Sequence, residues 1–282
     1  MNRYYSLFLI MLLLVGCKQT LQLKHPESIA CTEEFIYVSN VNGDPSAKDS
    51  NGFISKLYKN GAVCENQFIA RLNAPKGMCL VGNTLFVTDL DNVAGFNILT
   101  KKQAFNFDFS AYNTQFLNDI CWDGEKMLYV SSTDMNEIFS IDLYMQKISS
   151  LNLKDSLSGT NGLCFHDSIL YIVEMGNDSI KGSLAQVSFK NKQATFSRIL
   201  NHTGILDGLF YCENKLYFSD WQTNGNTTKA QIHIFDLQTK TLSNFPLDKS
   251  YNGIADITYD SLHHRIIAPV MEENKIEFWK LN

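Results

Sequence analysis

The sequence lacks the features that would divide it into domains or direct it to nucleic acid. Only five prolines occur and sixteen glycines are spread along 282 residues, so no stretch has the composition of an interdomain linker. Charged residues make up 19% and the formal net charge is −5, which excludes the basic footprint of a nucleic-acid-binding protein. No stretch shows helical periodicity, and no apolar run after the N-terminus approaches the length of about 18 residues that spans a membrane. With 45% apolar and 12% aromatic residues, the chain has enough apolar side chains for a large core.

The N-terminus has the pattern of an export signal. Arg3 is followed by an uncharged apolar run from Leu7 to Val15, which ends at Gly16-Cys17. Cys17, preceded by Leu-Val-Gly, resembles the lipobox cysteine of a bacterial lipoprotein, which is lipidated and becomes the first residue of the mature protein. An ordinary signal peptide with a chance cysteine is the alternative.

This interpretation divides the chain into three parts. We predict a signal peptide over 1–16, a lipidated Cys17 with a tether over 17–24, and one mature domain over 25–282. The resemblance implies an outer-membrane lipoprotein of the bacterial cell envelope, facing the periplasm or the cell surface, because Lys18 rather than an aspartate follows the cysteine. Contact with the membrane would run through the lipid on Cys17, and a monomer is expected.

A short sequence pattern repeats six times along the mature chain. A leading residue is followed by apolar residues, and an aromatic-rich run comes about ten positions later. The leading positions are Glu27, Lys76, Asn118, Asn161, Asp207 and Ala255, at spacings of 49, 42, 43, 46 and 48 residues. A period of about 40–50 residues built from short β-branched and aromatic runs is typical of β-propeller blades.

Further alternating runs, such as 231–237 and 146–151, supply a third and a fourth strand to the repeat. We therefore predict an all-β, six-bladed β-propeller with four antiparallel strands per blade; the single repeat disfavours the alternative, a two-domain β-sandwich. Residues 275–281 complete only a third strand of the last blade. Its fourth strand is expected from residues near Leu21 and Leu23.

The leading positions should converge on the central channel, since the first strand of each blade lines it. Small polar residues at strand starts also accept turn hydrogen bonds, but that alternative predicts a similar residue in every blade. Instead the column holds two carboxylates (Glu27, Asp207) and two amides (Asn118, Asn161). Such an all-oxygen set favours a divalent cation, most of all Ca²⁺, with Mg²⁺, Mn²⁺ or Zn²⁺ as alternatives.

The ordered set resembles the regucalcin/gluconolactonase family of six-bladed propellers, which is related to diisopropylfluorophosphatase and paraoxonase. Glu27 stands in Pro26-Glu27-Ser28, Asn118 before Asp119, Asn161 before Gly162 and Asp207 before Gly208, in blades one, three, four and five. The resemblance implies a divalent-metal-dependent hydrolase that acts on a small-molecule lactone, ester or phosphoester. Its metal ligands would be Glu27, Asn118, Asn161 and Asp207, with Asp207 also the catalytic base or nucleophile.

Two positions depart from the family pattern. Phe116 stands where sugar-lactone enzymes commonly carry an arginine, which implies a more apolar substrate or no sugar substrate. Lys76 joins the inner column, where its ammonium either pairs with Glu27 or is carried into solvent by its long stem. Asn118, Lys76, Phe116 and Trp221 are the expected substrate-binding residues, from the column and the loops 40–51 and 220–226. A non-catalytic binding module similar to NHL-repeat proteins, with a structural metal, is the alternative function.

Cysteine and histidine add no site of their own. Cys79, Cys121 and Cys164 recur three residues after the leading position, which favours free thiols packed in the repeat, while a bridge among Cys31, Cys64 and Cys212 stays open. The six histidines show no spacing suited to a metal pair. No Gly-x-Ser-x-Gly elbow and no phosphate-binding glycine loop occur.

Overall fold

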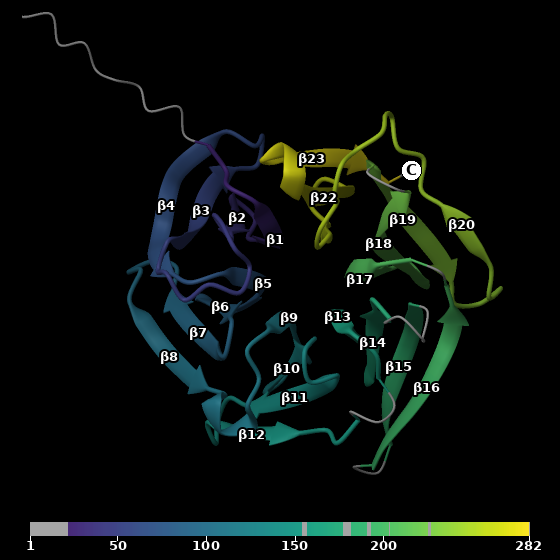
Figure 1. The fold of residues 1–282 in the computed structure, drawn as a ribbon, viewed down its shortest axis with the longest axis horizontal. Coiled ribbons are helices and arrows are strands. Elements are labelled where there is room, and N and C mark those ends of the chain that lie inside the picture. The colour runs from purple at the N-terminus through teal and green to yellow at the C-terminus, as the bar shows by residue number, and fades with distance from the viewer. Residues whose placement is uncertain are drawn as a thin grey trace, which may run out of the picture.

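The computed structural model describes residues 22–153, 157–176, 182–190, 193–202, 204–224 and 227–281. Six small antiparallel sheets stand around a central channel (Figure 1), which confirms the predicted all-β, six-bladed propeller. The helical segments of the described residues are two single turns, η1 (Ser110–Tyr112) and η2 (Met271–Glu273). Residues 1–16 of the predicted signal peptide and Cys17 lie outside the described residues. No helix in the described ranges is long and apolar enough to cross a membrane.

The first five sheets each hold four strands, ordered from the channel outward as they follow along the chain. Blades one to three comprise β1 (Pro26–Cys31), β2 (Phe35–Asn40), β3 (Gly52–Tyr58), β4 (Val63–Leu72), β5 (Pro75–Val81), β6 (Thr84–Asp89), β7 (Asn92–Asn97), β8 (Gln103–Asp108), β9 (Leu117–Trp122), β10 (Met127–Ser132), β11 (Glu137–Asp142) and β12 (Lys147–Ser150). Blades four and five comprise β13 (Thr160–His166), β14 (Ile169–Glu174), β15 (Ser183–Lys190), β16 (Gln193–Asn201), β17 (Leu206–Cys212), β18 (Lys215–Asn224), β19 (Thr227–Asp236) and β20 (Leu242–Asn244).

The sixth sheet has three strands in the described residues, β21 (Thr258–Asp260), β22 (Arg265–Val270) and β23 (Lys275–Lys280). The predicted third strand is thus present, but the fourth strand expected near Leu21 and Leu23 is not formed by Leu23. That side chain is buried against Ile29 and Ile267 in a cluster shared by blades one and six, and the neighbouring backbone bonds to residues 40–42 instead. Leu21 lies outside the described residues.

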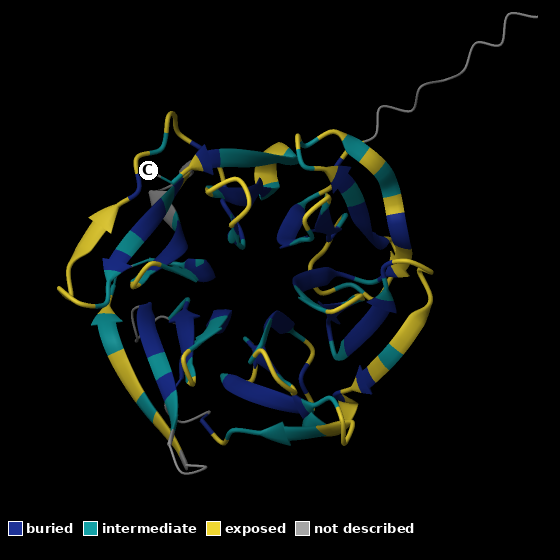
Figure 2. Cartoon of the chain, turned by 180° about the vertical axis from the view of Figure 1, so that it is seen from behind, coloured by how far each residue is buried: buried dark blue, intermediate teal, exposed yellow. Residues whose placement is uncertain are grey.

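Apolar side chains fill the spaces between neighbouring sheets. Inner strands are buried and outer strands alternate with exposed positions (Figure 2), because the faces of each sheet pack on the sheets beside it while the outermost strand meets solvent. Phe210 of blade five, for example, stacks on Tyr217 and on Tyr259 of blade six at centroid distances of 4.8 and 5.9 Å. Each such pair stabilises the contact by about 0.5–1.5 kcal/mol beyond its buried area.

The second residue of every inner strand from β1 to β17 lies at an irregularity of the pairing. The register with the second strand shifts between Pro26 and Ile29, and the corresponding shift recurs in β5, β9, β13 and β17. Such a bulge redirects a side chain that regular pairing would place on a sheet face. The bulge in each inner strand therefore directs the leading residue of the repeat toward one end of the channel.

The segment 220–226, predicted as a loop, is mostly strand. β18 continues to Asn224 and β19 begins at Thr227, and the two pair through Trp221↔Ala230 and beyond. Thr223, Thr227 and Thr228 are β-branched residues that favour strand on both sides of the turn residues Gly225-Asn226. The loop prediction for 220–226 is therefore wrong for its described part.

Candidate functional site

A pocket of about 200 Å³ opens where the inner strands begin. Its wall contains every propeller residue predicted for the site, namely Glu27, Lys76, Asn118, Asn161, Asp207, Phe116 and Trp221, completed by Val41, Pro45, Met175, Ile205 and Met271. Val41 and Pro45 belong to the predicted blade-one loop. The structure thus brings the leading residues of five blades together, while the sixth, Ala255, is buried and is not among the lining residues.

Two oxygen atoms at this site are buried without a hydrogen-bond partner. They are Glu27 Oε2 and Asn118 Oδ1, in side chains that are 6% and 5% exposed. The Asn118 amide nitrogen is used, since it donates to Thr133 Oγ1 at 3.1 Å. A buried acceptor left unpaired costs about 1–3 kcal/mol, so the two oxygens call for a donor or a cation.

Burial sets the protonation of Glu27. It raises the pKa of this carboxyl well above 4.5, and the nearby carboxylates of Asp207 and Asp256 raise it further, while Lys76 opposes the shift. In the absence of a cation, burial and the neighbouring carboxylates therefore favour the protonated form of this side chain. A divalent ion among these carboxylates would reverse that preference.

Asp207 is held by two neighbours. Trp221 Nε1 donates to Asp207 Oδ2 at 2.9 Å, and the Asn161 side chain, whose amide donates to the Leu206 carbonyl at 3.2 Å, also favours the anion of this carboxylate. Burial raises the pKa of Asp207 to about 6, against the influence of these two side chains. A carboxyl that titrates near 6 has the basicity of a general base that works close to neutral pH.

Lys76 follows neither of its two predicted courses. The side chain is 2% exposed, so the stem does not carry the charge into solvent, and among the described residues it forms no direct ion pair with Glu27. Its Nζ donates to the Pro45 and Ala74 carbonyl oxygens at 2.8 and 3.2 Å and lies 4.1 Å from the Phe116 ring centroid. Burial lowers the pKa of Lys76, and Glu27 counters the shift. Phe116 thus supports a buried ammonium by a cation–π contact.

The donor chemistry fits a hard divalent cation. The two unpartnered oxygens of Glu27 and Asn118, the carboxylate of Asp207 and the amide oxygen of Asn161 are the ligand types that Ca²⁺ accepts. None of them is a sulfur or an imidazole nitrogen, which a structural zinc site would use.

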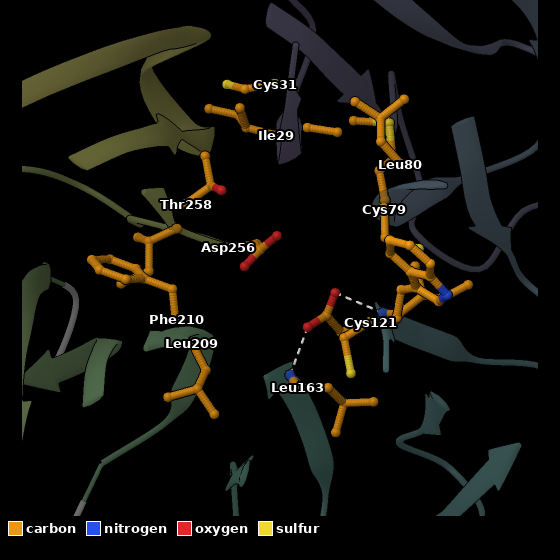
Figure 3. A pocket seen from close by; sticks show the side chains of 16 residues that line it. Ile29, Cys31, Cys79, Leu80, Cys121, Leu163, Leu209, Phe210, Asp256 and Thr258 are labelled. Carbon is orange, nitrogen blue, oxygen red and sulfur yellow. Dashed lines mark hydrogen bonds between the residues drawn. The ribbon is translucent and has the colours of Figure 1, made fainter. Parts of the chain in front are cut away.

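A second set of acids lines the channel next to the first, and sequence analysis missed it. Asp119 and Asp256 line a neighbouring pocket of about 240 Å³, and Figure 3 shows the Asp256 carboxylate directed into it. Asp119 accepts from the Ile120 and Leu163 amides at 2.7 and 2.6 Å, and burial raises its pKa to about 7. Both acids directly follow a leading position of the repeat, which is the signal that would have found them.

Cysteines contribute to the lining of this second pocket. Cys31, Cys79 and Cys121 line the same pocket, and all six described cysteines are free. No bridge forms among Cys31, Cys64 and Cys212. Burial raises the pKa of the Cys31 thiol to about 11 and raises the pKa of Cys79 and Cys121 as well, so the three thiols that line this pocket are packing groups rather than nucleophiles.

Comparison with known proteins shows the fold alone. No protein-family model matches the chain, and no curated protein matches its sequence. An auxiliary nutrient-binding protein from Bacteroides thetaiotaomicron is 12% identical with a TM-score of 0.70, over 91% of this chain and 70% of that one. Catalytically inactive virginiamycin B lyase from Staphylococcus aureus, solved with quinupristin, is 16% identical with a TM-score of 0.61, over 93% and 97%. Kuenenia stuttgartiensis hydrazine synthase is 15% identical with a TM-score of 0.66, over 91% and 76%.

These neighbours include a lyase and a binding protein on one propeller architecture, so they do not choose between an enzyme and a binding module. Membership of the regucalcin/gluconolactonase family is not confirmed by any of these comparisons. The metal, the reaction and the lipid anchor stay predictions.

Proposed function

We propose that this propeller is a divalent-metal-dependent hydrolase of the gluconolactonase type, acting on a lactone or an ester. The observation that carries the proposal is the pair of buried, unpartnered oxygens of Glu27 and Asn118, which line the same pocket as the Asp207 carboxylate. In a channel that binds nothing, such groups would only destabilise the fold, because burying each of them costs desolvation free energy. A cation site with an adjacent base accounts for both.

Each residue has a role in this proposal. Glu27, Asn118, Asn161 and Asp207 hold the ion, Ca²⁺ before Mg²⁺, Mn²⁺ or Zn²⁺. When bound, the ion supplies Lewis-acid polarisation of a carbonyl or phosphoryl oxygen. Asp207 takes the proton from the attacking water, or attacks directly, while the Trp221 indole fixes the orientation of its carboxylate.

The pocket wall indicates the class of substrate. Val41, Met175, Ile205 and Met271 give it an apolar lining, and the Phe116 ring is covered by the Lys76 ammonium. A lactone or ester with an apolar body suits such a wall better than a polyhydroxylated sugar, which needs several polar partners. A phosphoester is the less favoured substrate, since Lys76 is the one cationic side chain among the lining residues.

The same proposal places the protein at the cell envelope. The apolar run 7–15 and the Cys17 lipobox pattern support a lipid anchor, with the propeller as a monomer at the outer membrane. Incorporation of a labelled fatty acid, lost in Cys17→Ser, tests this part independently of the chemistry.

Metal binding and turnover are tested together on the chelated protein. Returning Ca²⁺ is expected to raise the Tm and to restore hydrolysis of a panel of lactones and aryl esters. Asp207→Asn is expected to lower the rate by about 10²–10⁴-fold, the usual contribution of a general base. The matched control is Asp167→Asn, because Asp167 is 87% exposed and lies outside the pocket lining.

The outcomes separate the two functions. If no divalent ion binds the wild-type protein, the metal-site proposal is wrong. If Ca²⁺ raises the Tm but the panel stays silent, the non-catalytic NHL-like binding module with a structural metal replaces the hydrolase.

A further inference from the structure

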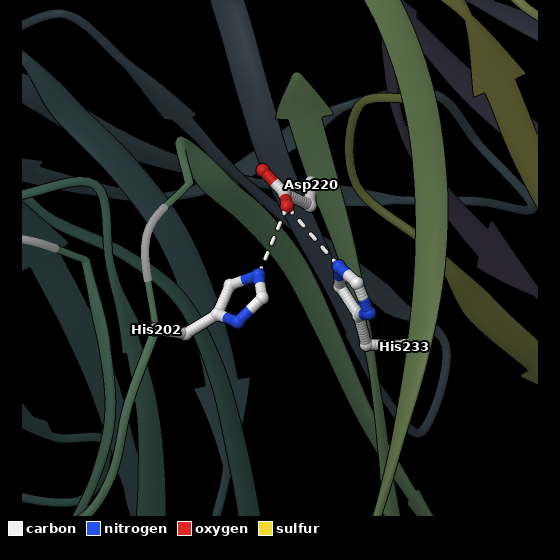
Figure 4. Close-up of side chains that lie close together, drawn as sticks. All are labelled: His202, Asp220 and His233. Carbon is white, nitrogen blue, oxygen red and sulfur yellow. Dashed lines mark hydrogen bonds and ion pairs between the residues drawn. The ribbon is translucent and has the colours of Figure 1, made fainter. Parts of the chain in front are cut away.

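Three side chains meet outside the channel, between the end of blade four and the hairpin of blade five. His202 follows β16, Asp220 lies in β18 and His233 lies in β19 (Figure 4). Each histidine places Nε2 3.1 Å from Asp220 Oδ2, and all three candidate ligand atoms lie within 4.8 Å of one another. The side chains of Asp220 and His233 are 0% and 4% exposed, and that of His202 is 17% exposed.

His233 contacts a polar side chain through each ring nitrogen. Nδ1 lies 2.9 Å from Asn244 Oδ1, and Nε2 lies 3.1 Å from Asp220 Oδ2. In the tautomer that carries its proton on Nδ1, this nitrogen donates to the Asn244 carbonyl oxygen and Nε2 presents a lone pair toward the carboxylate. A cation between Nε2 and Oδ2 would be stabilised by both atoms.

Acidic residues at similar positions in other blades show which hydrogen bonds of this cluster belong to the fold itself. Asp89 and Glu174, the last residues of β6 and β14, accept backbone amides of the preceding connection, as Asp220 Oδ1, within β18, does from Ile205 at 3.0 Å. In blade four Arg198 Nε also donates to Glu174 Oε2 at 2.9 Å. The other oxygen of Asp220 faces two imidazoles.

We propose that His202, Asp220 and His233 form a binding site for a divalent transition-metal ion of the Zn²⁺ class. Two neutral imidazole nitrogens and one carboxylate oxygen are a common zinc donor set. Bond lengths of about 2.0–2.2 Å to each atom are compatible with the 3.1 Å ligand spacing. Asn244 on His233 and the Ile205 amide on Asp220 act as outer partners that orient the ligands, and the partly exposed His202 leaves a way in for a water as fourth ligand.

A metal ion at this site would stabilise the part of the channel pocket that Ile205 and Trp221 line. Asp220 holds the Ile205 amide, and the Trp221 amide donates to the Ile205 carbonyl at 2.9 Å, while both Ile205 and Trp221 line the pocket. His202, Asp220 and His233 are not among the lining residues of that pocket, so metal binding here would not depend on the proposed hydrolase.

Zinc alone is the probe. After chelation, the wild-type protein is expected to take up about one equivalent of Zn²⁺ with imidazole ligands, measured by native mass spectrometry and by the side-chain ¹⁵N shifts of labelled histidine. His202→Ala and His233→Ala should each lose this uptake, and Asn244→Ala should weaken it by about 10–100-fold, as loss of an outer partner usually does. His166→Ala is the matched control, because His166 also lies beside an aspartate, at 3.4 Å, but on the surface.

Three results would overturn the site. One is a wild-type protein that binds no Zn²⁺ and shows His233 with both ring nitrogens protonated, which would make the cluster a hydrogen-bonded ion pair. Another is Zn²⁺ uptake lost in Asp207→Asn but kept in His202→Ala, which would place the ion in the channel. The third is equal loss in His166→Ala. The first reading uses the wild-type protein, so it holds even where a variant does not fold.

Discussion

Individual carboxyl groups determine how the stability of this propeller depends on pH and on divalent cations. Glu27, Asp119, Asp207 and Asp256 all have pKa values raised first by burial. They lie close enough for the charges of Asp207 and Asp256 to raise the pKa of Glu27. Without a cation, ionising them costs folding free energy; with one, the same carboxylates become its ligands or neighbours.

The stability of the metal-free protein should therefore depend on pH with an uncommon sign. The pKa of Asp207 rises from 3.8 to about 6 on folding, so between these values the native state binds more protons than the unfolded chain. The free energy of unfolding is expected to fall as the pH rises from about 4 to about 6, by about 3 kcal/mol for this group. Urea unfolding of the chelated protein at a series of pH values measures it.

Two comparisons isolate the cause. Saturating Ca²⁺ should flatten the fall, because the ion favours the ionised carboxylate, and Asp207→Asn should remove its share in the metal-free protein. A free energy of unfolding that rises steadily from pH 4 to pH 6 without metal would contradict this account.

At the scale of the element, the inner strand is the unit that builds the site. The bulge after the strand start is accompanied by a hydroxyl from the second strand in several blades. Ser131 accepts the Asp119 amide at 2.8 Å, and Ser219 both accepts the Gly208 amide and donates to the Ala255 carbonyl of the next blade. These bonds satisfy backbone groups that regular pairing leaves open. The sequence repeat shows the leading residues but not these hydroxyls, since Ser and Thr are common in strands of any kind.

Gly162, the third residue of β13, is required by the close approach of β17. A Cβ added to Gly162 would lie 2.2 Å from the Asp207 carbonyl oxygen and 3.0 Å from the Gly208 carbonyl carbon. Both contacts are backbone, so β13 and β17 would have to separate. Asn161 and Asp207 would separate with them.

Gly162→Ala is thus expected to destabilise the protein by about 1–3 kcal/mol, the usual range for overpacking, and to weaken Ca²⁺ binding at the channel. The matched control is Gly82→Asn, because Gly82 has φ +56° and a Cβ there meets nothing within 4 Å, and asparagine tolerates this conformation. Calorimetry with and without Ca²⁺ measures both effects. Equal behaviour of the two variants would show that the close approach of the inner strands does not position the site.

At the scale of the whole molecule, the six-fold repeat was sufficient to predict the architecture and to place Glu27, Asn118, Asn161 and Asp207 together. A periodic sequence specifies its own neighbours, because equivalent residues of a closed ring must converge. Features that break the period could not be predicted in this way. His202 and His233 lie 31 positions apart and meet only because Asp220 and His233 sit diagonally across the β18–β19 pair.

Closure of the ring is another such feature. Blade six has three strands in the described residues. Within these residues, the contact between blades six and one includes a backbone hydrogen bond from the Asp256 amide to the Glu27 carbonyl at 3.1 Å, and side chains add to it. Asp260 accepts from Arg265 Nε at 2.9 Å and from Lys59 Nζ of blade one at 3.2 Å, and Arg265 also donates to the Lys59 carbonyl at 2.6 Å.

Loss of Asp260 should therefore open the ring at this contact. The Asp260 side chain is 2% exposed, and although burial opposes it, the hydrogen bonds from Arg265 and Lys59 hold its pKa below 3.8. Asp260→Ala leaves the partly buried Lys59 and Arg265, which are 14% and 16% exposed, without their anion, which should cost up to about 3–5 kcal/mol. Lys126→Ala breaks the more exposed pair with Asp142, where Lys126 is 48% exposed, and should cost at most about 1 kcal/mol. Urea unfolding together with limited proteolysis near residues 59–62 separates a locally opened ring from global loss of stability, and equal free energies of unfolding for the two variants would show that the ring is closed by apolar packing instead.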